Sequence, residues 1–146
     1  MNRTKIFSAA LVLASLFSMP AIAGEPNGMF IMRTTTKSPD AVQAAIKAYV
    51  LEKKWLYVND NKLKAGEVTQ VRMCVPDIGK DTWKAGMHIS ALVPCGQIGI
   101  YEQDGVTKIS MLHPGFMNAL YPDPILKKAG EDLLPLLTTM LDEVVK

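Results

Sequence analysis

The sequence lacks most of the features that mark enzymes and nucleic-acid-binding proteins. It contains no glycine-rich phosphate-binding loop and no pair of carboxylates on a recognised motif. Its two histidines are His88 and His113, and neither stands in a spaced motif with a serine, a cysteine or an acid. We therefore expect no catalytic activity. A basic stripe with interleaved aromatic residues is also missing, which argues against nucleic acid as a partner.

Long apolar runs are equally scarce, and the one that is present lies near the N-terminus. It spans residues 6–17, follows Arg3 and Lys5, and precedes a small-residue Ala-Ile-Ala sequence at 21–23. At 12 residues it is shorter than the roughly 20 that a membrane-spanning helix needs. The pattern predicts a signal peptide over 1–23 that is cleaved on export to the periplasm, with a retained anchor as the alternative. After cleavage we expect no contact with the membrane.

The remaining chain, residues 24–146, carries no net charge, because the loss of Arg3 and Lys5 leaves 14 basic and 14 acidic residues. Its length is enough for one domain with a hydrophobic core and too short for two. The sequence does not identify a partner. A small ligand or another protein is compatible with it, and so is a homodimer.

Hydrophobic periodicity and capping residues predict an α+β fold, a two-layer sandwich with helices on one face of a mainly antiparallel sheet. Helix starts are predicted at 38–40 and 123–124, and we expect Gly130 and Pro135 to break or kink the second helix. The predicted elements are a strand at 29–36, a helix from 39, a short strand at 55–58, a polar turn region at 59–64, a strand at 67–75, a short helix at 81–92, a hairpin around 104–105 and a helix from 124.

The hairpin has the strongest local signal, because the Asp-Gly pair at 104–105 suits a type I′ turn with two positive φ angles. With that pair in the turn, Ile100 faces Ile109 and Ile98 faces Met111, which gives one apolar face that ends at His113. The opposite face is more polar, with Lys108 expected to be exposed. It carries Cys95, Gln97, Gly99, Tyr101, Lys108 and Ser110.

Three parts of the chain resemble the domain-of-unknown-function family 302. They are VRMCVP at 71–76, LVPCGQIGIYEQDGVTKISMLHPGFM at 92–117, and the amphipathic C-terminal helix. The resemblance covers about residues 28–145 and implies a TATA-binding-protein-like fold with the element order β-α-β-β-β-β-α, but no activity. This chain departs from the family pattern at Val75, where asparagine is common, and at Gly96-Gln97, where an arginine usually follows the cysteine.

The two cysteines are predicted to form a disulfide. Cys74 ends one predicted strand and Cys95 begins a later one, and in an antiparallel sheet such ends lie at the same edge. Export would place both in an oxidising compartment, where disulfides persist. A redox-active or ligand-binding thiol pair is the alternative interpretation, and a free thiol is the third.

A copper site is a second hypothesis, because methionines 73, 87 and 111 lie within two residues of Cys74, His88 and His113. Thioether, thiolate and imidazole groups together suit Cu(I). The ligands would be Met111 and His113 with Met87 or His88. Core packing is the favoured interpretation of these methionines, since no ligand spacing repeats, and we therefore predict no cofactor.

A small-ligand site between the sheet and a helix is a third hypothesis. Its lining would be aromatic, unless these residues simply belong to the core: Trp55, Trp83, Tyr101 and Phe116. Taken together, the sequence predicts an exported, non-catalytic binding or accessory module. A periplasmic copper-binding or thiol-redox protein is the alternative.

Overall fold

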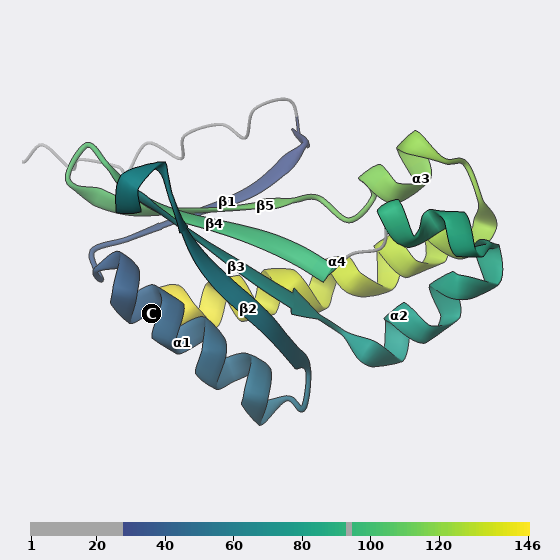
Figure 1. Cartoon of the computed structure of the whole chain (residues 1–146), viewed down its shortest axis with the longest axis horizontal. Helices are drawn as coiled ribbons and strands as arrows, with labels where there is room; N and C mark the ends of the chain where they lie inside the picture. The colour runs from purple at the N-terminus through teal and green to yellow at the C-terminus, as the bar shows by residue number, and fades with distance from the viewer. Residues whose placement is uncertain (1–27, 93–94) are drawn as a thin grey trace, which may run out of the picture.

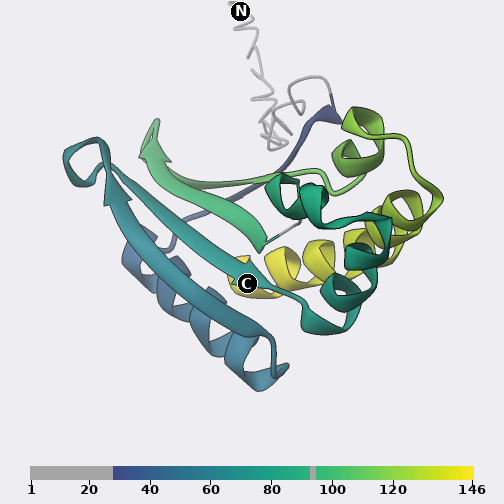
Figure 2. The same ribbon diagram turned by 45° about the vertical axis from the view of Figure 1, so that its right-hand side comes forward.

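The structure of the protein, a computed structural model, describes residues 28–92 and 95–146. Its architecture is α+β, as predicted: a five-stranded antiparallel sheet with long helices packed against one face (Figure 1 and Figure 2). The predicted signal peptide at 1–23 lies outside the described residues. No helix in the described part of the chain is long and apolar enough to cross a membrane.

The sheet brings strands that are distant in the sequence into contact. In chain order the strands are β1 (Phe30–Thr35), β2 (Leu56–Leu63), β3 (Val68–Cys74), β4 (Cys95–Gln103) and β5 (Val106–Leu112). Their order across the sheet is β1-β5-β4-β3-β2, and every neighbouring pair is antiparallel. β4 is therefore the central strand, while β1 and β2 form the two edges.

Two long helices, α1 (Pro39–Glu52) and α4 (Pro124–Val145), form the second layer. The shorter helices gather beyond the end of the sheet at which β3 and β5 finish (Figure 1). They are α2 (Pro76–Thr82), η3 (Trp83–Ala85), η4 (Met87–Ala91) and α3 (Phe116–Leu120). The predicted order β-α-β-β-β-β-α is therefore present, with these short helices added between its members.

Both long helices begin where the capping residues predict. Ser38 Oγ accepts a hydrogen bond from Ala41 N at 3.3 Å, and Asp123 Oδ1 accepts one from Ile125 N at 2.7 Å. These bonds satisfy amide groups that have no partner within the helix. Each helix then buries an apolar stripe against the sheet, formed by Val42, Ile46 and Val50 in α1 and by Leu126, Ala129, Leu133, Leu137, Met140, Leu141 and Val144 in α4.

The predicted register of the hairpin is confirmed. Ile100 pairs with Ile109 and Ile98 pairs with Met111, all four side chains are at most 2% exposed, and the turn residues 104–105 have φ values of 57° and 76°. The expectation that Lys108 is exposed is wrong, because its side chain is only 19% exposed. Its ammonium group bends back to Gln103 Oε1 at 3.1 Å and to Asp104 Oδ2 at 3.4 Å.

The predicted turn region at 59–64 is wrong, because β2 continues through it to Leu63. Its polar side chains are compatible with a strand since β2 is an edge strand and is exposed along most of its length. The ladder to β3 shifts by one residue after Tyr57, which leaves Val58 in a bulge. The turn follows at η2 (Lys64–Gly66), where all three residues have positive φ.

The predicted helix at 81–92 is also wrong in its limits. α2 begins earlier, at Pro76, which occupies the first helical turn where a missing N–H costs nothing. The helical segment ends at Gly86, whose φ of 119° only glycine adopts without strain. Beyond it, residues 87–91 form the separate short helix η4.

Of the break or kink expected at Gly130 and Pro135, the break is absent, since α4 is one helix of 22 residues, and the kink stays a prediction. Pro135 removes one hydrogen bond, but it lies on the exposed side, and the Glu131 carbonyl that loses its partner belongs to an exposed residue. The buried stripe on the opposite side keeps both halves of the helix packed on the sheet. Gly130 allows the chain after β5 to pack closely against α4, because a Cβ at this position would lie 3.1 Å from the Pro114 carbonyl oxygen.

Candidate functional site

The candidate site lies on the face of the sheet that is turned away from α1 and α4, which we call the outer face. Strand alternation assigns residues to it, since the neighbours of each buried core residue point to the opposite side. On the three inner strands it carries Val68, Gln70, Arg72, Cys74, Cys95, Gln97, Gly99, Tyr101, Val106, Lys108, Ser110 and Leu112. These positions include the polar face that the hairpin register predicted.

A cavity of about 500 Å³ opens at the end of this face, where β4 begins and β5 finishes, and it extends past the end of the sheet to the core residues Met111, Met117 and Leu137. Most of its wall is apolar, with polar groups from Gln70, Gln97, Ser110 and His113. No Lys, Arg, Asp or Glu is among the described residues that line it. The described residues that line it are Phe30, Gln70, Leu92, Cys95, Gly96, Gln97, Gly99, Ser110, Met111, Leu112, His113, Pro114, Met117 and Leu137.

Small residues meet across the hairpin in the cavity wall. Gly99 pairs with Ser110 on one side and with Gln70 on the other. A Cβ on Gly99 would lie 2.9 Å from Ser110 Oγ, so the absence of a side chain at Gly99 makes room for the Ser110 hydroxyl at the cavity wall. Gln70 Nε2 donates a hydrogen bond to Gln97 Oε1 at 2.8 Å, which fixes the amide groups at the rim.

His113 is held at the cavity by the chain that follows it. Gly115 N donates a hydrogen bond to His113 Nδ1 at 3.1 Å. Because Nδ1 is the acceptor, the neutral imidazole carries its proton on Nε2 and offers a donor there. The turn that contains Gly115 packs closely against α4, since a Cβ on Gly130 would lie 3.3 Å from Gly115 N and 3.2 Å from Gly115 Cα.

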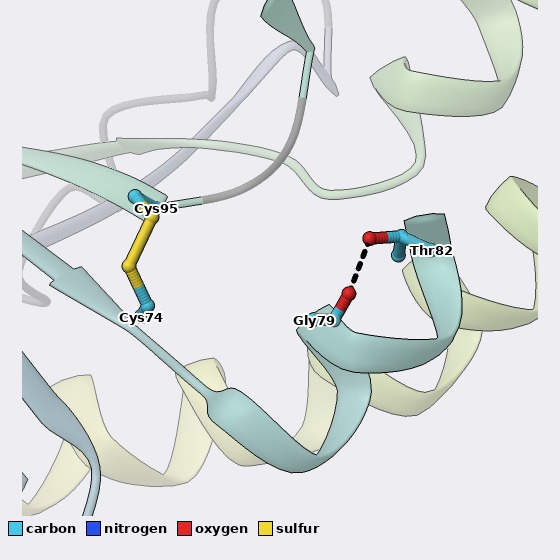
Figure 3. The surroundings of a disulfide bond; sticks show 4 residues. All are labelled: Cys74, Gly79, Thr82 and Cys95. Carbon is cyan, nitrogen blue, oxygen red and sulfur yellow. Dashed lines mark hydrogen bonds between the residues drawn. A yellow bond between two sulfur atoms is a disulfide. The ribbon is translucent and has the colours of Figure 1, made fainter. Parts of the chain in front are cut away.

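The predicted disulfide is present, and no cysteine of the described chain is free (Figure 3). Cys74 and Cys95 stand directly opposite each other as the last pair of the β3–β4 ladder, with their Cα atoms 4.3 Å apart. Both are half-buried on the outer face, and Cys95 lines the cavity. In the neighbouring helix α2, Thr82 Oγ1 donates to the Gly79 carbonyl at 2.6 Å, and the Thr82 side chain is fully buried.

The structure brings together only half of the copper ligand set. Met111 and His113 both line the cavity, whereas Met87 is 76% exposed and His88 packs edge-on against the Tyr121 ring at 5.2 Å. The described residues contain no cluster of three His, Cys, Asp or Glu side chains that could hold a metal ion. Met111 instead packs in the core, where its Sδ and that of Met73 lie near the space that the missing side chain of Gly96 leaves.

The four aromatic residues predicted as ligand lining are not brought to one site. Trp55 packs edge-on against the Tyr49 ring at 5.7 Å, and Trp83 is 41% exposed. Tyr101 lies on the outer face opposite Lys108, and Phe116 begins α3. None of the four is among the described residues that line the cavity, so their assignment to the lining of this site is not supported.

Sequence reasoning missed several residues that form the cavity, above all Phe30, Leu112, Gly99 and Ser110. The register predicted from the hairpin already places Gly99 opposite Ser110, so a depression on this face was detectable from the sequence. Phe30 meets Leu112 only because β1 pairs with β5. Nothing local in the sequence indicates that pairing.

A second cavity, of about 400 Å³, lies between α2 and α4, and its charged groups are already paired. Lys84 Nζ lies 2.7 Å from Asp81 Oδ1, and Lys128 Nζ lies 2.8 Å from Asp132 Oδ2. The hydrogen bond from Lys84 lowers the pKa of Asp81, and the hydrogen bond to Asp132 raises the pKa of Lys128. Because these charges satisfy one another, the uncharged cavity on the outer face is the better candidate site.

Comparisons with known proteins agree with this fold. The family model described as "Domain of unknown function DUF302" matches residues 53–144. A crystal structure of an uncharacterized conserved DUF302 protein from Bacillus stearothermophilus superposes with a TM-score of 0.72 at 14% sequence identity. The match covers 81% of this chain and 98% of that one, and at this identity it shows a shared fold alone. No curated protein matches the sequence. The family match extends over more than half of the chain, which therefore belongs to the DUF302 family.

Proposed function

We propose that the protein is an exported, non-catalytic binding module that holds a small neutral molecule in the cavity on the outer face. The observation that carries the proposal is the lining of that cavity, which is largely apolar and has no charged side chain among the described residues. A volume of about 500 Å³ is in the usual range for small-molecule sites, roughly 300–1,000 Å³.

The absence of charge in the lining favours a neutral ligand on energetic grounds. A charged group would lose its hydration on entering the cavity and would find no opposite charge to compensate. The polar groups that are present suit a molecule with a few hydrogen-bonding atoms. Ser110 offers a hydroxyl, Gln70 and Gln97 offer amides, and His113 offers the donor on Nε2.

Export is supported by two independent features of the chain. The first is the signal-peptide pattern at 1–23, and the second is the disulfide, which persists in oxidising compartments such as the periplasm. In this proposal, the exported protein binds its ligand in the periplasm.

We expect the exported protein to begin at Gly24. The Ala-Ile-Ala sequence at 21–23 is the type of site that signal peptidase cleaves. The measurement is the intact mass of the protein purified from the periplasmic fraction. A mass that retains residues 1–23 would contradict the cleavage, and recovery of the protein in the cytoplasm alone would contradict export.

Binding is tested with N-phenyl-1-naphthylamine, a neutral apolar dye that becomes fluorescent when it leaves water. We expect saturable fluorescence with the folded protein and a much weaker response to the anionic relative 1-anilinonaphthalene-8-sulfonate. Leu112→Asp places a charge in the cavity wall and should weaken dye binding on the order of tenfold, because the dye cannot solvate that charge.

Leu56→Asp is the matched control for this measurement. Leu56 is also an outer-face leucine on a strand, its exposure of 54% is close to the 47% of Leu112, and it does not line the cavity. We expect dye binding to be unchanged in this variant. Equal loss of binding in the two variants, or no saturable binding by the unmodified protein, would refute the proposed site.

A further inference from the structure

We propose that the cavity delivers a small neutral thiol to Cys95, where the thiol undergoes exchange with the Cys74–Cys95 disulfide. This inference rests on the proposed function, because it uses the same cavity, and it adds a reaction and a ligand class. Its basis is the position of the disulfide: Cys95 forms part of the described cavity wall, and its partner Cys74 does not.

The two cysteines are not equivalent with respect to the cavity. Cys95 is among the described lining residues, whereas Cys74 is not. Cys74 lies on β3, Cys95 lies on β4, and most of the cavity wall comes from β4, β5 and the residues that follow β5. Apart from Gln70, the lining that comes from the sheet therefore lies on β4 or on the β5 side of it, away from the strand that carries Cys74.

This arrangement matches the geometry of thiol–disulfide exchange. A thiolate attacks one sulfur atom along the line of the S–S bond and displaces the other sulfur from the opposite side. Extended past Cys95, the line from Cys74 to Cys95 runs across the sheet from β3 toward β5, where Leu112 and His113 line the cavity. A molecule bound there stands on the side from which Cys95 is attacked.

The step is balanced in atoms and electrons. The thiol RSH first gives its proton to water, and a lone pair of the thiolate sulfur forms a new S–S bond to Cys95 Sγ. The electrons of the old S–S bond leave with Cys74 Sγ as a thiolate. The incoming sulfur is thereby oxidised and Cys74 is reduced, so the products are a mixed disulfide on Cys95 and a free Cys74.

Two neighbouring side chains favour the negative charge that this step requires. His113 lines the cavity, and its neutral imidazole carries a donor on Nε2, because Nδ1 accepts from Gly115 N. A donor of this kind stabilises a thiolate more than a thiol. On the other side of the bridge, Arg72 stands two residues before Cys74 on the same face of β3. Its positive charge favours the thiolate that leaves.

The first measurement identifies which cysteine is attacked. The exported protein with its disulfide intact is incubated with 2-mercaptoethanol, quenched with acid, treated with N-ethylmaleimide and digested for peptide mass spectrometry. We expect mercaptoethanol on Cys95 and maleimide on Cys74. Mercaptoethanol on Cys74, or equal amounts on both cysteines, would overturn the proposal.

The second measurement tests whether the cavity delivers the thiol. For 2-mercaptoethanol and for anionic mercaptoacetate, the exchange rate of the folded protein is divided by the rate in urea, which removes the intrinsic reactivity of each thiol. We expect this ratio to favour the neutral thiol on the order of tenfold. Leu112→Lys should remove the preference, because its positive charge attracts the carboxylate of mercaptoacetate in the cavity. Leu63→Lys is the control and should keep the preference, since Leu63 is an outer-face leucine of 43% exposure at the other end of β2 and is not among the described residues that line the cavity. Equal ratios for the two thiols in the unmodified protein would overturn the proposal.

Failure of this inference is distinguishable from failure of the proposed function. If dye binding is saturable and sensitive to Leu112→Asp but the thiol attacks Cys74, the cavity binds small molecules and only the exchange proposal is wrong. If the unmodified protein binds no dye, the proposed function itself fails.

Discussion

Ile100→Ala and Ile109→Ala are each expected to lower the free energy of unfolding by about 2–5 kcal/mol. Both side chains are fully buried, and they face each other across the hairpin of β4 and β5 at the centre of the sheet. Truncation removes apolar contacts within the core that the sheet forms with α1 and α4, and it leaves a cavity that the surrounding strands cannot fill. Chemical denaturation of each variant, followed by circular dichroism, measures the effect.

Leu112→Ala is the control for these two substitutions. Leu112 lies on β5, as Ile109 does, but it points to the outer face and is 47% exposed. We expect a loss below about 1 kcal/mol, since much of this side chain is already in contact with water. Similar losses for Ile109→Ala and Leu112→Ala would mean that the strand does not bury the predicted face.

Lys108 is less suitable as a control, because the exposure of its side chain depends on neighbouring groups. Alternation assigns Lys108 to the outer face correctly, but the fold of the turn brings its ammonium group to Gln103 and Asp104. The face of a residue follows from the strand period, whereas the exposure of a long side chain also depends on groups that it can reach.

Most of the fold could be predicted because its main signals are local. The Asp-Gly pair at 104–105 sets the hairpin register, and the alternation in β3 identifies its buried side, with Val71 and Met73 in the core. The capping residues Ser38 and Asp123 identify the starts of both long helices. Each of these signals depends on residues within a few positions of one another.

The errors occurred where tertiary structure outweighs local preference. The polar second half of β2 has the composition of a turn, and it is a strand because β3 supplies its hydrogen-bonding partners. Pro135 resembles a helix breaker, but the stripe buried on the other side of α4 keeps the helix continuous. Neither outcome is visible in a short window of sequence.

The candidate site was predicted only in part, for the same reason. The disulfide, Met111 and His113 were identified from the sequence, and the structure places Cys95, Met111 and His113 at one cavity. The four aromatic residues proposed as ligand lining do not line this cavity, because a sequence pattern does not tell which aromatic side chains the fold brings together. Among the described Phe, Tyr and Trp residues, Phe30 lines the cavity, and the pairing of β1 with β5 brings it there.

Removal of the disulfide is expected to lower the free energy of unfolding by about 3 kcal/mol. The bridge joins residues that are 21 positions apart. In the unfolded chain it therefore closes a loop made of the residues that form α2, η3 and η4 in the folded protein. A loss of this size is a large part of the roughly 5–15 kcal/mol that stabilises a typical domain. The measurement compares urea denaturation of the oxidised protein with that of the Cys74→Ala/Cys95→Ala variant.

Two controls separate the loss of the bridge from other effects of the substitutions. Reduction of the unmodified protein with dithiothreitol should lower the urea midpoint to nearly that of the double variant, and the reductant should leave the double variant itself unchanged. Alkylation of the unreduced protein in denaturant should label neither cysteine, because both sulfur atoms are bonded. Two labelled cysteines, or a midpoint that reduction does not move, would show that the bridge does not stabilise the exported protein.

Because the disulfide closes the last pair of the β3–β4 ladder, we also expect the reduced protein to lose amide protection first at Met73 and Gly96, before the hairpin core is affected.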